Sequence, residues 1–530
     1  MSPEPPPSPV SAWAPLRIAR YRSFWAASFA MYVGIWMQNV GAAWLMSTLT
    51  TSPFLIASVQ FATNLPVFLL SLPAGVLADQ RDPRLIMLAT FGWMVLVGVL
   101  VSVATFTGHV TPGTLLVATI LLGTGFAVAG PAVQVTVSEL VPRNLLPQAV
   151  TMGGVAFNTA RSVGPALAGV ILTGASSAWV FVASSVSVLA ILVSVWAMPG
   201  FKRKTAGPPE RLLSGMRTGI RYALHSPGVI APLMRATLFG LCASAVWALL
   251  PLLVSSGQGG AGGFGLMVAC LGAGAVLSAF LASWIRSVPD KLTFAAALLY
   301  AAAMFTAAFV PWVPVLCGLM MMAGIGWALT LNTAYATMQS VLPPWVRARV
   351  LSLYALFLQG SMAAGSLLWG SVAELTGVPA ALAAAAVLLV GGMLFARWRY
   401  RLQEGTEAQV TPVAPWIEFT MADEMDPDEG PVAVEIEYRV DPARGWQFVQ
   451  ASRAVGRARK RVGAMFWRCY RDLEIPGIYR ERFIVDSWAD YLRSRERATL
   501  ADRELEQELR AFHKGPGPVR VTHSIAEPSD

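Results

Sequence analysis

The stretch GVLADQRDPRLIML, residues 75–88, places a short polar segment between two long apolar runs. The runs at 54–78 and 85–107 are each long enough to cross the roughly 30 Å hydrocarbon core of a membrane as a helix. Arg81 and Arg84 lie in the segment between them, and cytosolic loops of membrane proteins collect such residues. The stretch therefore predicts a helical hairpin whose turn faces the cytosol.

The whole chain has the same character. Its 530 residues are 55% hydrophobic and 13% charged, which is too apolar for a soluble protein of this length. Apolar runs predict twelve spans, at 23–49, 54–78, 85–107, 113–140, 146–173, 177–198, 230–254, 261–285, 292–310, 312–341, 350–374 and 379–397. Among the loops that connect these spans, Lys and Arg occur only in alternate ones. We therefore expect a multi-pass protein of the cell membrane, in contact with lipid, with both termini in the cytosol.

Other compositional signals exclude several classes of function. The four cysteines lack the spacing of metal ligands, so no metal site, cofactor or disulfide framework is expected. The net charge of +9 comes largely from loops beside the apolar runs, which argues for membrane topology rather than nucleic-acid binding. The Pro-rich start lacks a short apolar core with a cleavage site, so no signal peptide is predicted.

The two halves of the apolar region are related. LLGTGFAVAGPAVQVTVSELVP (121–142) matches MMAGIGWALTLNTAYATMQSVLP (321–343), and the shift of 201 residues also pairs Arg161 with Met362. This pattern predicts two six-helix repeats in parallel orientation. The expected domains are a cytosolic tail (1–22), a first bundle (23–198), a cytosolic linker (199–229), a second bundle (230–401), an acidic linker (402–430) and a C-terminal domain (431–530).

These features resemble one family. Residues 75–88 resemble the signature of the major facilitator superfamily between its second and third helices, with Gly75, Asp79 and Arg84 in place and Asp82 and Pro83 departing from it. GPALAG resembles the exporter-associated motif of that superfamily, through Gly164, Pro165 and Gly169. NTARSVGPALAG and SELVPRNLLPQAV resemble the subgroup of enterobactin-type siderophore exporters and macrolide-efflux-like proteins, the transmembrane secretion effectors.

The resemblance implies an all-α membrane fold of twelve helices and a secondary transporter that works by alternating access. It implies export of a siderophore or a similar amphipathic small molecule, and no enzymatic activity in the membrane domain. A multidrug or macrolide efflux pump is one alternative, and a membrane-tethered monooxygenase is another. Gly75, Asp79 and Arg84 would form a conformational latch, in which Asp79 accepts hydrogen bonds from a helix N-terminus or pairs with Arg84 or Arg143.

Arg161 is the charged residue farthest from both ends of a predicted span. A charge at that depth costs roughly 2.5–3.5 kcal/mol on insertion scales and usually marks a partner, a wet cavity or a pathway. It shares a helical face with Asn158 and Pro165, and Pro165 deprives the Arg161 carbonyl of its usual donor. Backbone carbonyls, Glu139, an anionic substrate and the amides of the first span all remain candidate partners.

By the architecture of the resembled family, the first, fourth, seventh and tenth spans line a central cavity and the second, fifth, eighth and eleventh border it. The candidate substrate contacts are then Trp36, Gln38, Asn39, Gln134, Trp247, Asn332 and Tyr335. Aromatic and amide side chains suit a large amphipathic ligand. No carboxylate lies deep in a span, so Glu139 is the candidate coupling residue, with pairing to Arg143 as the alternative.

The chain changes character after Arg401. Residues 431–530 predict the order β-α-β-β-α-β of a ferredoxin-like domain. This segment resembles the dimeric α+β barrel of antibiotic-biosynthesis monooxygenases. His513 and His523 have no clear partners in the sequence, so a dimerisation or regulatory role is favoured over catalysis, and a homodimer through this domain is expected.

Overall fold

The computed structural model describes residues 11, 13–199, 219–255, 259–285, 288–402, 411, 426 and 429–526. Most of the predicted linkers at 199–229 and 402–430, and residues 1–10 of the predicted tail, lie outside this set. The chain divides into two compact units. The first comprises Met1–Gly207, Arg235–Thr333 and Ala355–Arg399, and the second Pro208–Met234, Ala334–Tyr354 and Tyr400–Asp530.

The first half of the apolar region forms long helices. They are α1 (Ala19–Leu49), α2 (Pro53–Gln80), α3 (Pro83–Phe106), α4 (Pro112–Leu140), α5 (Leu146–Gly174) and α6 (Ser177–Trp196). Four of them, α2 to α5, carry a proline in their first turn. Asp82 caps α3, because its carboxylate accepts a hydrogen bond from the Arg84 N–H at 2.9 Å, and Pro83 occupies the first helical position. The two residues that depart from the family signature thus start a helix.

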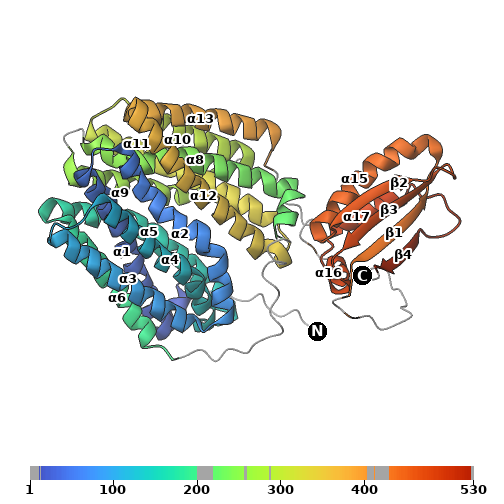
Figure 1. The fold of residues 1–530 in the computed structure, drawn as a ribbon, viewed down its shortest axis with the longest axis horizontal. Coiled ribbons are helices and arrows are strands. Elements are labelled where there is room, and N and C mark those ends of the chain that lie inside the picture. The colour runs from blue at the N-terminus through green and yellow to red at the C-terminus, as the bar shows by residue number, and fades with distance from the viewer. Residues whose placement is uncertain are drawn as a thin grey trace. The chain divides into compact units, whose positions relative to one another are not determined.

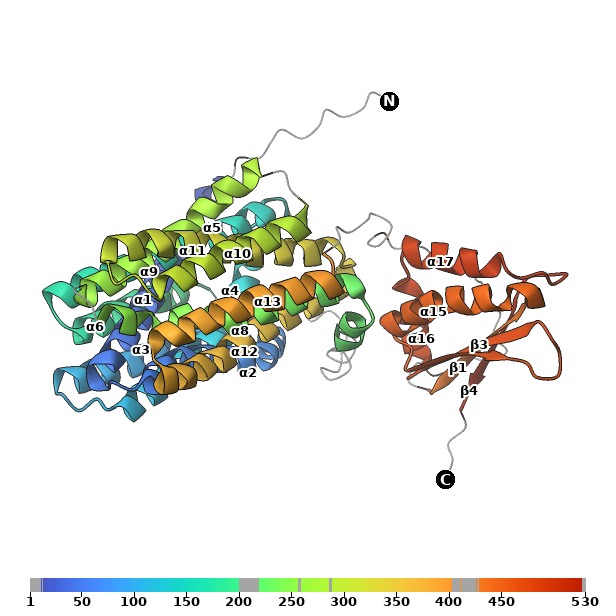
Figure 2. The same cartoon turned by 90° about the horizontal axis from the view of Figure 1, so that it is seen from above.

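The second half repeats this arrangement. Its helices are α8 (Pro227–Ser255), α9 (Gly260–Trp284), α10 (Pro289–Ala307), α11 (Val313–Ser340), α12 (Pro344–Thr376) and α13 (Val378–Arg399). Figure 1 shows α1–α6 gathered in one group and α8–α13 in another, and Figure 2 shows the same helices from above. Ten helices of the described chain are long and apolar enough to cross a membrane, and α1 and α10 are outside that ten. The polytopic helical architecture is confirmed, and a total of twelve spans stays a prediction.

The two halves approach one another closely where α5 ends and α9 begins. A Cβ atom placed on Gly265 of α9 would lie 2.5 Å from the Cα of Gly169 on α5, so the two backbones are in contact there. Near the same end of the helices, the carboxylate of Glu374 on α12 accepts hydrogen bonds from the Ser52 hydroxyl (2.7 Å) and the Phe54 N–H (3.1 Å). We call the end of the helices where these two contacts lie the closed end.

A buried ion pair ties together three helices of the second half. Arg235 of α8 is 1% exposed, and its Nη2 lies 2.5 Å from the carboxylate of Asp290 at the start of α10. Arg397 of α13 reaches the other oxygen of Asp290 at 3.3 Å. Removing a charge from water is costly, and Asp290 compensates this cost for the cation that α8 carries into the bundle.

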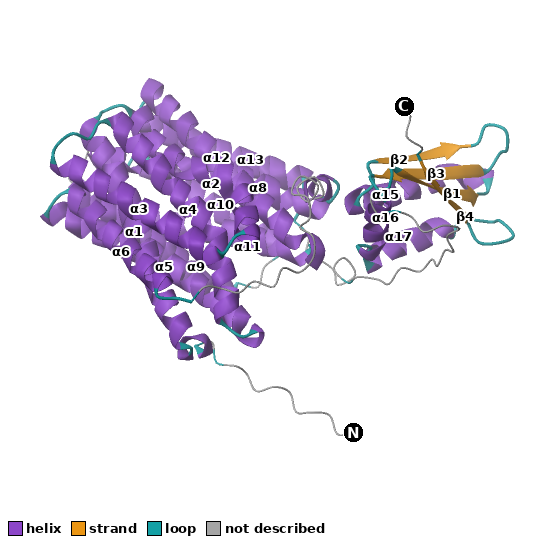
Figure 3. Ribbon diagram, turned by 60° about the horizontal axis from the view of Figure 1, so that its bottom comes forward, coloured by secondary structure: helices purple, strands orange, loops and turns teal. Residues whose placement is uncertain are grey.

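The C-terminal residues form a small antiparallel sheet with helices on one face (Figure 3). The elements are β1 (Val432–Arg439), α15 (Gly445–Val462), β2 (Phe466–Arg471), β3 (Ile478–Val485), α16 (Trp488–Glu496), α17 (Leu500–Arg510) and β4 (Arg520–Ile525). The spatial strand order is β2-β3-β1-β4, and every neighbouring pair is antiparallel. Buried residues alternate along β1, as expected for a sheet covered on one face. Assignment of this domain to the ferredoxin-like class stays a prediction.

Candidate functional site

The first unit contains a cavity of about 250 Å³ between the two halves. Residues of α1, α2, α4 and α5 line it from the first half, with Met94 of α3, and residues of α8, α9, α11 and α12 line it from the second half. These eight helices correspond to the spans that the resembled family uses to line and border its cavity. The cavity is therefore the candidate substrate site, and we call it the central cavity.

Arg161 lies in this cavity inside a cage of three indole rings, which we call the tryptophan cage. The side chain is 8% exposed. Its guanidinium carbon lies 5.7 Å from the ring centroid of Trp36 on α1, 5.4 Å from that of Trp247 on α8 and 5.4 Å from that of Trp327 on α11. Each distance is within the range of a cation–π attraction. Aromatic faces from both halves thus hold one buried cation.

Small residues on α5 and α9 bring the helices close enough to form the cage. A Cβ atom on Gly164, one turn after Arg161, would lie 2.7 Å from the Cβ of Trp36, so the glycine lets α1 approach α5 at this level. A Cβ atom on Gly272 of α9 would lie 2.7 Å from the carbonyl oxygen of Arg161. That carbonyl, which Pro165 leaves without its helical donor, is therefore covered by the backbone of α9.

Several hydrogen-bond donors in the cage lack an acceptor. Nε and Nη2 of Arg161 are buried and have no hydrogen-bond partner among the described residues, and the same holds for the indole nitrogens of Trp36 and Trp247. None of the described residues that line the cavity is Asp or Glu. Cation–π contacts stabilise the charge but do not satisfy N–H donors, so the site offers donors for an acceptor that the described residues do not supply.

Amide side chains form another part of the cavity wall. Gln38 and Asn39 of α1 line it, as the sequence predicts. Gln38 already accepts a hydrogen bond from the Ser184 hydroxyl of α6, at 3.3 Å. Gln359 of α12 donates to the side-chain oxygen of Asn64 on α2, at 3.2 Å, and so links the two halves. The wall therefore combines flat aromatic faces with amides, which fits an amphipathic ligand.

Some predicted contact residues lie elsewhere. The structure does not bring Gln134, Asn332 or Tyr335 to the described lining of the cavity. Gln134 and Asn332 are exposed on their helices, and Tyr335 packs edge-on against Tyr354. Thr119 and Leu122 of α4 and Trp327 of α11 line the cavity instead. Gln134 follows Thr119 by four turns, about 22 Å of helix, so it belongs to a different depth of the bundle.

The residues of the predicted helix-5 motif separate into two roles. Arg161 faces the cavity, as does its neighbour Phe157, which was not part of the predicted motif, whereas Asn158 is exposed and donates its amide to the carbonyl of Gly154 on its own helix. Gly164 and Pro165 are buried in helix packing, and Gly169 contacts Gly265 at the closed end. The side chains of Asn158 and Arg161 therefore lie in different surroundings, although their spacing predicted a shared helical face.

Of the predicted latch and coupling residues, Arg84 has partners that the sequence did not indicate. The side chain of Asp79 lies outside the described residues, and a Cβ atom on Gly75 would meet open space. Arg84 donates to the carbonyls of Val195 (3.3 Å) and Trp196 (2.8 Å), so it caps the C-terminus of α6. Glu139 is exposed, and the described residues form no ion pair between it and Arg143.

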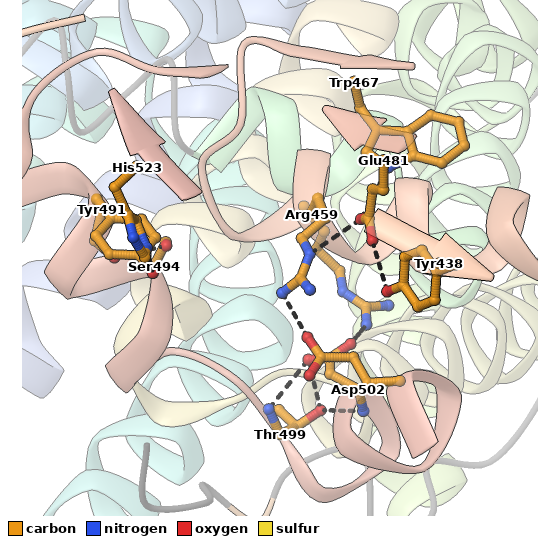
Figure 4. A network of polar contacts seen from close by, with 11 residues as sticks. Tyr438, Arg459, Trp467, Glu481, Tyr491, Ser494, Thr499, Asp502 and His523 are labelled. Atoms are coloured by element: carbon orange, nitrogen blue, oxygen red, sulfur yellow. Dashed lines mark hydrogen bonds and ion pairs between the residues drawn. The ribbon is translucent and has the colours of Figure 1, made fainter. Parts of the chain in front are cut away.

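The C-terminal domain contains a buried polar network around Glu481 (Figure 4). Glu481 is fully buried and accepts hydrogen bonds from the Tyr438 hydroxyl (3.1 Å), the Trp467 indole (3.1 Å) and Nε of Arg459 (3.3 Å). Arg459 also pairs with Glu506. Burial and the neighbouring Glu481 raise the pKa of Tyr438 well above its ordinary value. A buried carboxylate whose hydrogen-bonding capacity is satisfied in this way stabilises the domain.

Both histidines that lacked partners in the sequence have them in the structure. Nε2 of His523 lies 2.7 Å from the Tyr491 hydroxyl, and burial, with a further contribution from the charge of Arg495, lowers the pKa of His523. The ring of His513 accepts from the Arg439 N–H at 3.0 Å and lies 3.1 Å from the carbonyl of Gly517. The described residues contain no group of His, Cys, Asp and Glu that could hold a metal ion.

Comparison with known proteins points to transporters. The staphyloferrin A transporter of Staphylococcus aureus is 29% identical over 164 residues, which cover 31% of this chain and 41% of that protein. The putative multidrug resistance protein MdtD of Enterobacter sp. is 30% identical over 92 residues, which cover 17% of this chain and 20% of that protein. The matched regions therefore span less than half the length of either relative.

Solved structures share the fold at low identity. A bacterial homologue of the human lysosomal transporter Spinster, in an inward-facing and occupied conformation, aligns with a TM-score of 0.58 and 13% identity over 72% of this chain and 97% of that one. The nucleoside transporter NupG aligns with a TM-score of 0.58 and 13% identity, over 72% of this chain and all of that one.

The family model described as transmembrane secretion effector matches residues 10–530, which include the C-terminal domain. This family and the similar proteins are transporters and not enzymes. The chain therefore belongs to the transmembrane secretion effector family of major facilitator superfamily transporters.

Proposed function

We propose that this protein exports an amphipathic small molecule of the siderophore type across the cell membrane. The observation that carries the proposal is the central cavity, in which three indole rings, several amides and one buried cation face the same space. Such a wall binds a molecule with both flat apolar parts and polar groups. The similarity to a staphyloferrin A transporter supports the siderophore class.

Alternating access is the mechanism that we propose for this cavity. The loops at the closed end, including residues 50–52 and 107–112, contain no Lys or Arg, and we assign this end to the outer face. The molecule would then be closed toward the outside, which agrees with the inward-facing state named for the Spinster homologue. Binding of substrate would shift the balance toward a state in which the closed end separates.

A multidrug or macrolide efflux pump is the second candidate. The aromatic wall of the cavity would also bind large neutral molecules, and the similarity to MdtD favours this class. The monooxygenase alternative is not retained, because the family and the similar proteins are transporters.

The proposal is tested by comparing cells that contain the protein with cells from which its gene is deleted, during growth with little iron. An iron-chelating metabolite should accumulate inside the deleted cells and fall in the medium. Restoring the gene with Asp79→Asn should restore membrane insertion and only part of the export, because the residue keeps its shape and loses its charge. Gln134→Ala, outside the described cavity lining, is the matched control and should restore export fully.

Equal distribution of metabolites in the two strains would reject the siderophore proposal. A change in resistance to macrolides, with unchanged metabolites, would favour the second candidate.

We further propose that the C-terminal domain serves dimerisation or regulation. β2 is an edge strand, and it exposes Phe466 (36%) and Tyr470 (48%) to solvent, which suits pairing with a second copy. Light scattering of the purified full chain should give the mass of a dimer, and Tyr470→Arg should give the mass of a monomer. A monomer for the unaltered protein would leave regulation as the role of the domain.

A further inference from the structure

We infer that Arg161 binds an oxyanion of the transported molecule, so that preferred substrates carry a carboxylate or a catecholate. This inference rests on the proposed export function and specifies its substrate class. It depends on three observations: the charge balance of the cavity, the unsatisfied donors of the tryptophan cage and the asymmetry of the two repeats.

The cavity holds a cation without a described anion. Among the described residues that line the cavity, Arg161 is the only charged one, and none of the others is Asp or Glu. A buried charge is stable in protein interiors when a counter-charge and hydrogen bonds compensate it. Elsewhere in this bundle the chain supplies such a partner, because Asp290 pairs with the equally buried Arg235. The described lining of the cavity therefore has no counter-ion for Arg161, and an anionic substrate can supply one.

The donors have the pattern that an oxyanion satisfies. Nε and Nη2 of Arg161 and the indole nitrogens of Trp36 and Trp247 are without acceptors in the described chain. A carboxylate offers two oxygens with about four acceptor positions, and its geometry matches the fork of a guanidinium. The indole rings hold the guanidinium by cation–π attraction in the absence of substrate, and their faces remain available to a flat apolar group.

A purely structural role for Arg161 explains less. The candidate structural partner Gln38 is already engaged by Ser184 of α6. Met362, the counterpart of Arg161 in the second repeat, lines the same cavity with an uncharged side chain. The fold therefore accepts an apolar residue at this position, and the charge is an addition in one half only.

The test uses the full-length protein in lipid nanodiscs and two probes of nearly equal shape, salicylate and its neutral amide, salicylamide. Quenching of tryptophan fluorescence reports occupancy of the cage. Salicylate should bind saturably, and Arg161→Met should weaken it by roughly tenfold or more, as expected for loss of charge-assisted hydrogen bonds. The salicylate affinity of Arg161→Lys should lie between those of the unaltered protein and of Arg161→Met, because lysine keeps the charge and lacks the forked guanidinium. Salicylamide should bind weakly and equally to all three proteins.

Two controls separate recognition from folding and from lipid. Gln134→Ala, outside the described lining, should leave salicylate affinity unchanged, and the thermal midpoint of Arg161→Met should stay close to that of the unaltered protein. The titrations are run in nanodiscs of phosphatidylcholine and of phosphatidylglycerol, and equal affinities are expected. Weaker salicylate binding in phosphatidylglycerol would instead assign Arg161 to a lipid headgroup and overturn the inference.

Unchanged salicylate affinity in Arg161→Met would also overturn it, as would equal loss of both probes together with a lower thermal midpoint, which identifies a structural clamp. The outcome is separable from the proposed function. Export of neutral compounds with no salicylate binding would leave a transporter without an anion site. Binding of salicylate that depends on Arg161, with no change of metabolites in deleted cells, would leave the anion site and reject siderophore export.

Discussion

Asp290 neutralises a cation that would otherwise be buried without a counter-charge. We expect Asp290→Ala to destabilise the protein by about 3–5 kcal/mol, because removal of one partner of a buried ion pair leaves the other charge uncompensated. The measurement is the loss of folded protein during thermal unfolding in detergent. The double variant Arg235→Met, Asp290→Leu should recover most of the loss, since an apolar pair of similar volume replaces the ion pair. Failure of the double variant to recover would show that Asp290 has a role beyond neutralising Arg235.

His523 makes the stability of the C-terminal domain depend on pH. Burial and then Arg495 lower the pKa of His523 below its ordinary value of 6.5, so the folded state binds the proton less readily than the unfolded state. The contribution of neutral His523 to the stability of the folded domain is fully present above pH 6.5 and is lost as the pH falls through the lowered pKa. Hydrogen exchange of β4 in the full chain should therefore accelerate on acidification, after correction for intrinsic rates. His523→Gln should remove this part of the acceleration, and an unchanged pH dependence would contradict the assignment.

The sequence identifies Arg161 as unusual but not its surroundings. The sequence alone shows that a charge lies in the middle of an apolar run, and the free-energy cost of burying that charge indicates that it has a partner. Trp36 and Trp247 were predicted at the cavity from their helices, whereas Trp327 was missed. No local pattern separates Trp327, which is 7% exposed, from Trp284, which is 87% exposed. Which face of a helix meets the cavity depends on packing between distant segments.

Helices α5 and α9 touch through their backbones at Gly169 and Gly265, and a single added methyl group should disturb this contact. Gly265→Ala would place a Cβ atom 2.5 Å from the Cα of Gly169, so the helices must separate at the closed end. We expect slower export and greater access of thiol reagents to a cysteine introduced at Thr173. Gly154→Ala is the matched control, because its Cβ would meet no atom within 4 Å. Export unchanged by Gly265→Ala would mean that the two backbones need not touch.

Element boundaries follow the sequence where capping residues and prolines stand at the ends. Apolar runs predict the centre of a helix, but the backbone continues into polar flanks. The predicted span at 350–374 is α12, Pro344–Thr376, and it begins at a proline six residues before the apolar run. The bilayer requires apolar side chains only along the part of a helix that lies in the hydrocarbon core. The helix itself continues until its backbone hydrogen bonds end. Hydropathy therefore underestimates the length of helices with charged ends.

The orientation of the whole molecule is open to a direct test. In a variant without native cysteines, Cys at His109 should react with an impermeant thiol reagent added to intact cells, because its loop lies on the side without Lys or Arg. Cys at Asn144 should react only after the membrane is opened. Both positions are exposed, so a difference reports sidedness rather than burial. The opposite pattern would reverse the proposed orientation.

At this scale the repeat in the sequence predicts two related six-helix groups, and the structure contains groups α1–α6 and α8–α13. The repeat could not predict where the halves differ chemically. Arg161 and Met362 occupy matching positions in the two repeats and line the same cavity. The structure adds that the Arg161 cation of the first half contacts Trp247 and Trp327 of the second half.

The contact of Gly169 with Gly265 also bears on the electrical insulation of the membrane. A seam closed by polar side chains would leave room for a chain of water molecules, along which protons could leak. Here two glycine backbones touch, and no side chain or water-sized gap stands between them at that point. We expect this contact to help a carrier keep the membrane potential while no substrate is bound. A bulkier residue at Gly265 should then cost the cell energy even when no substrate is present.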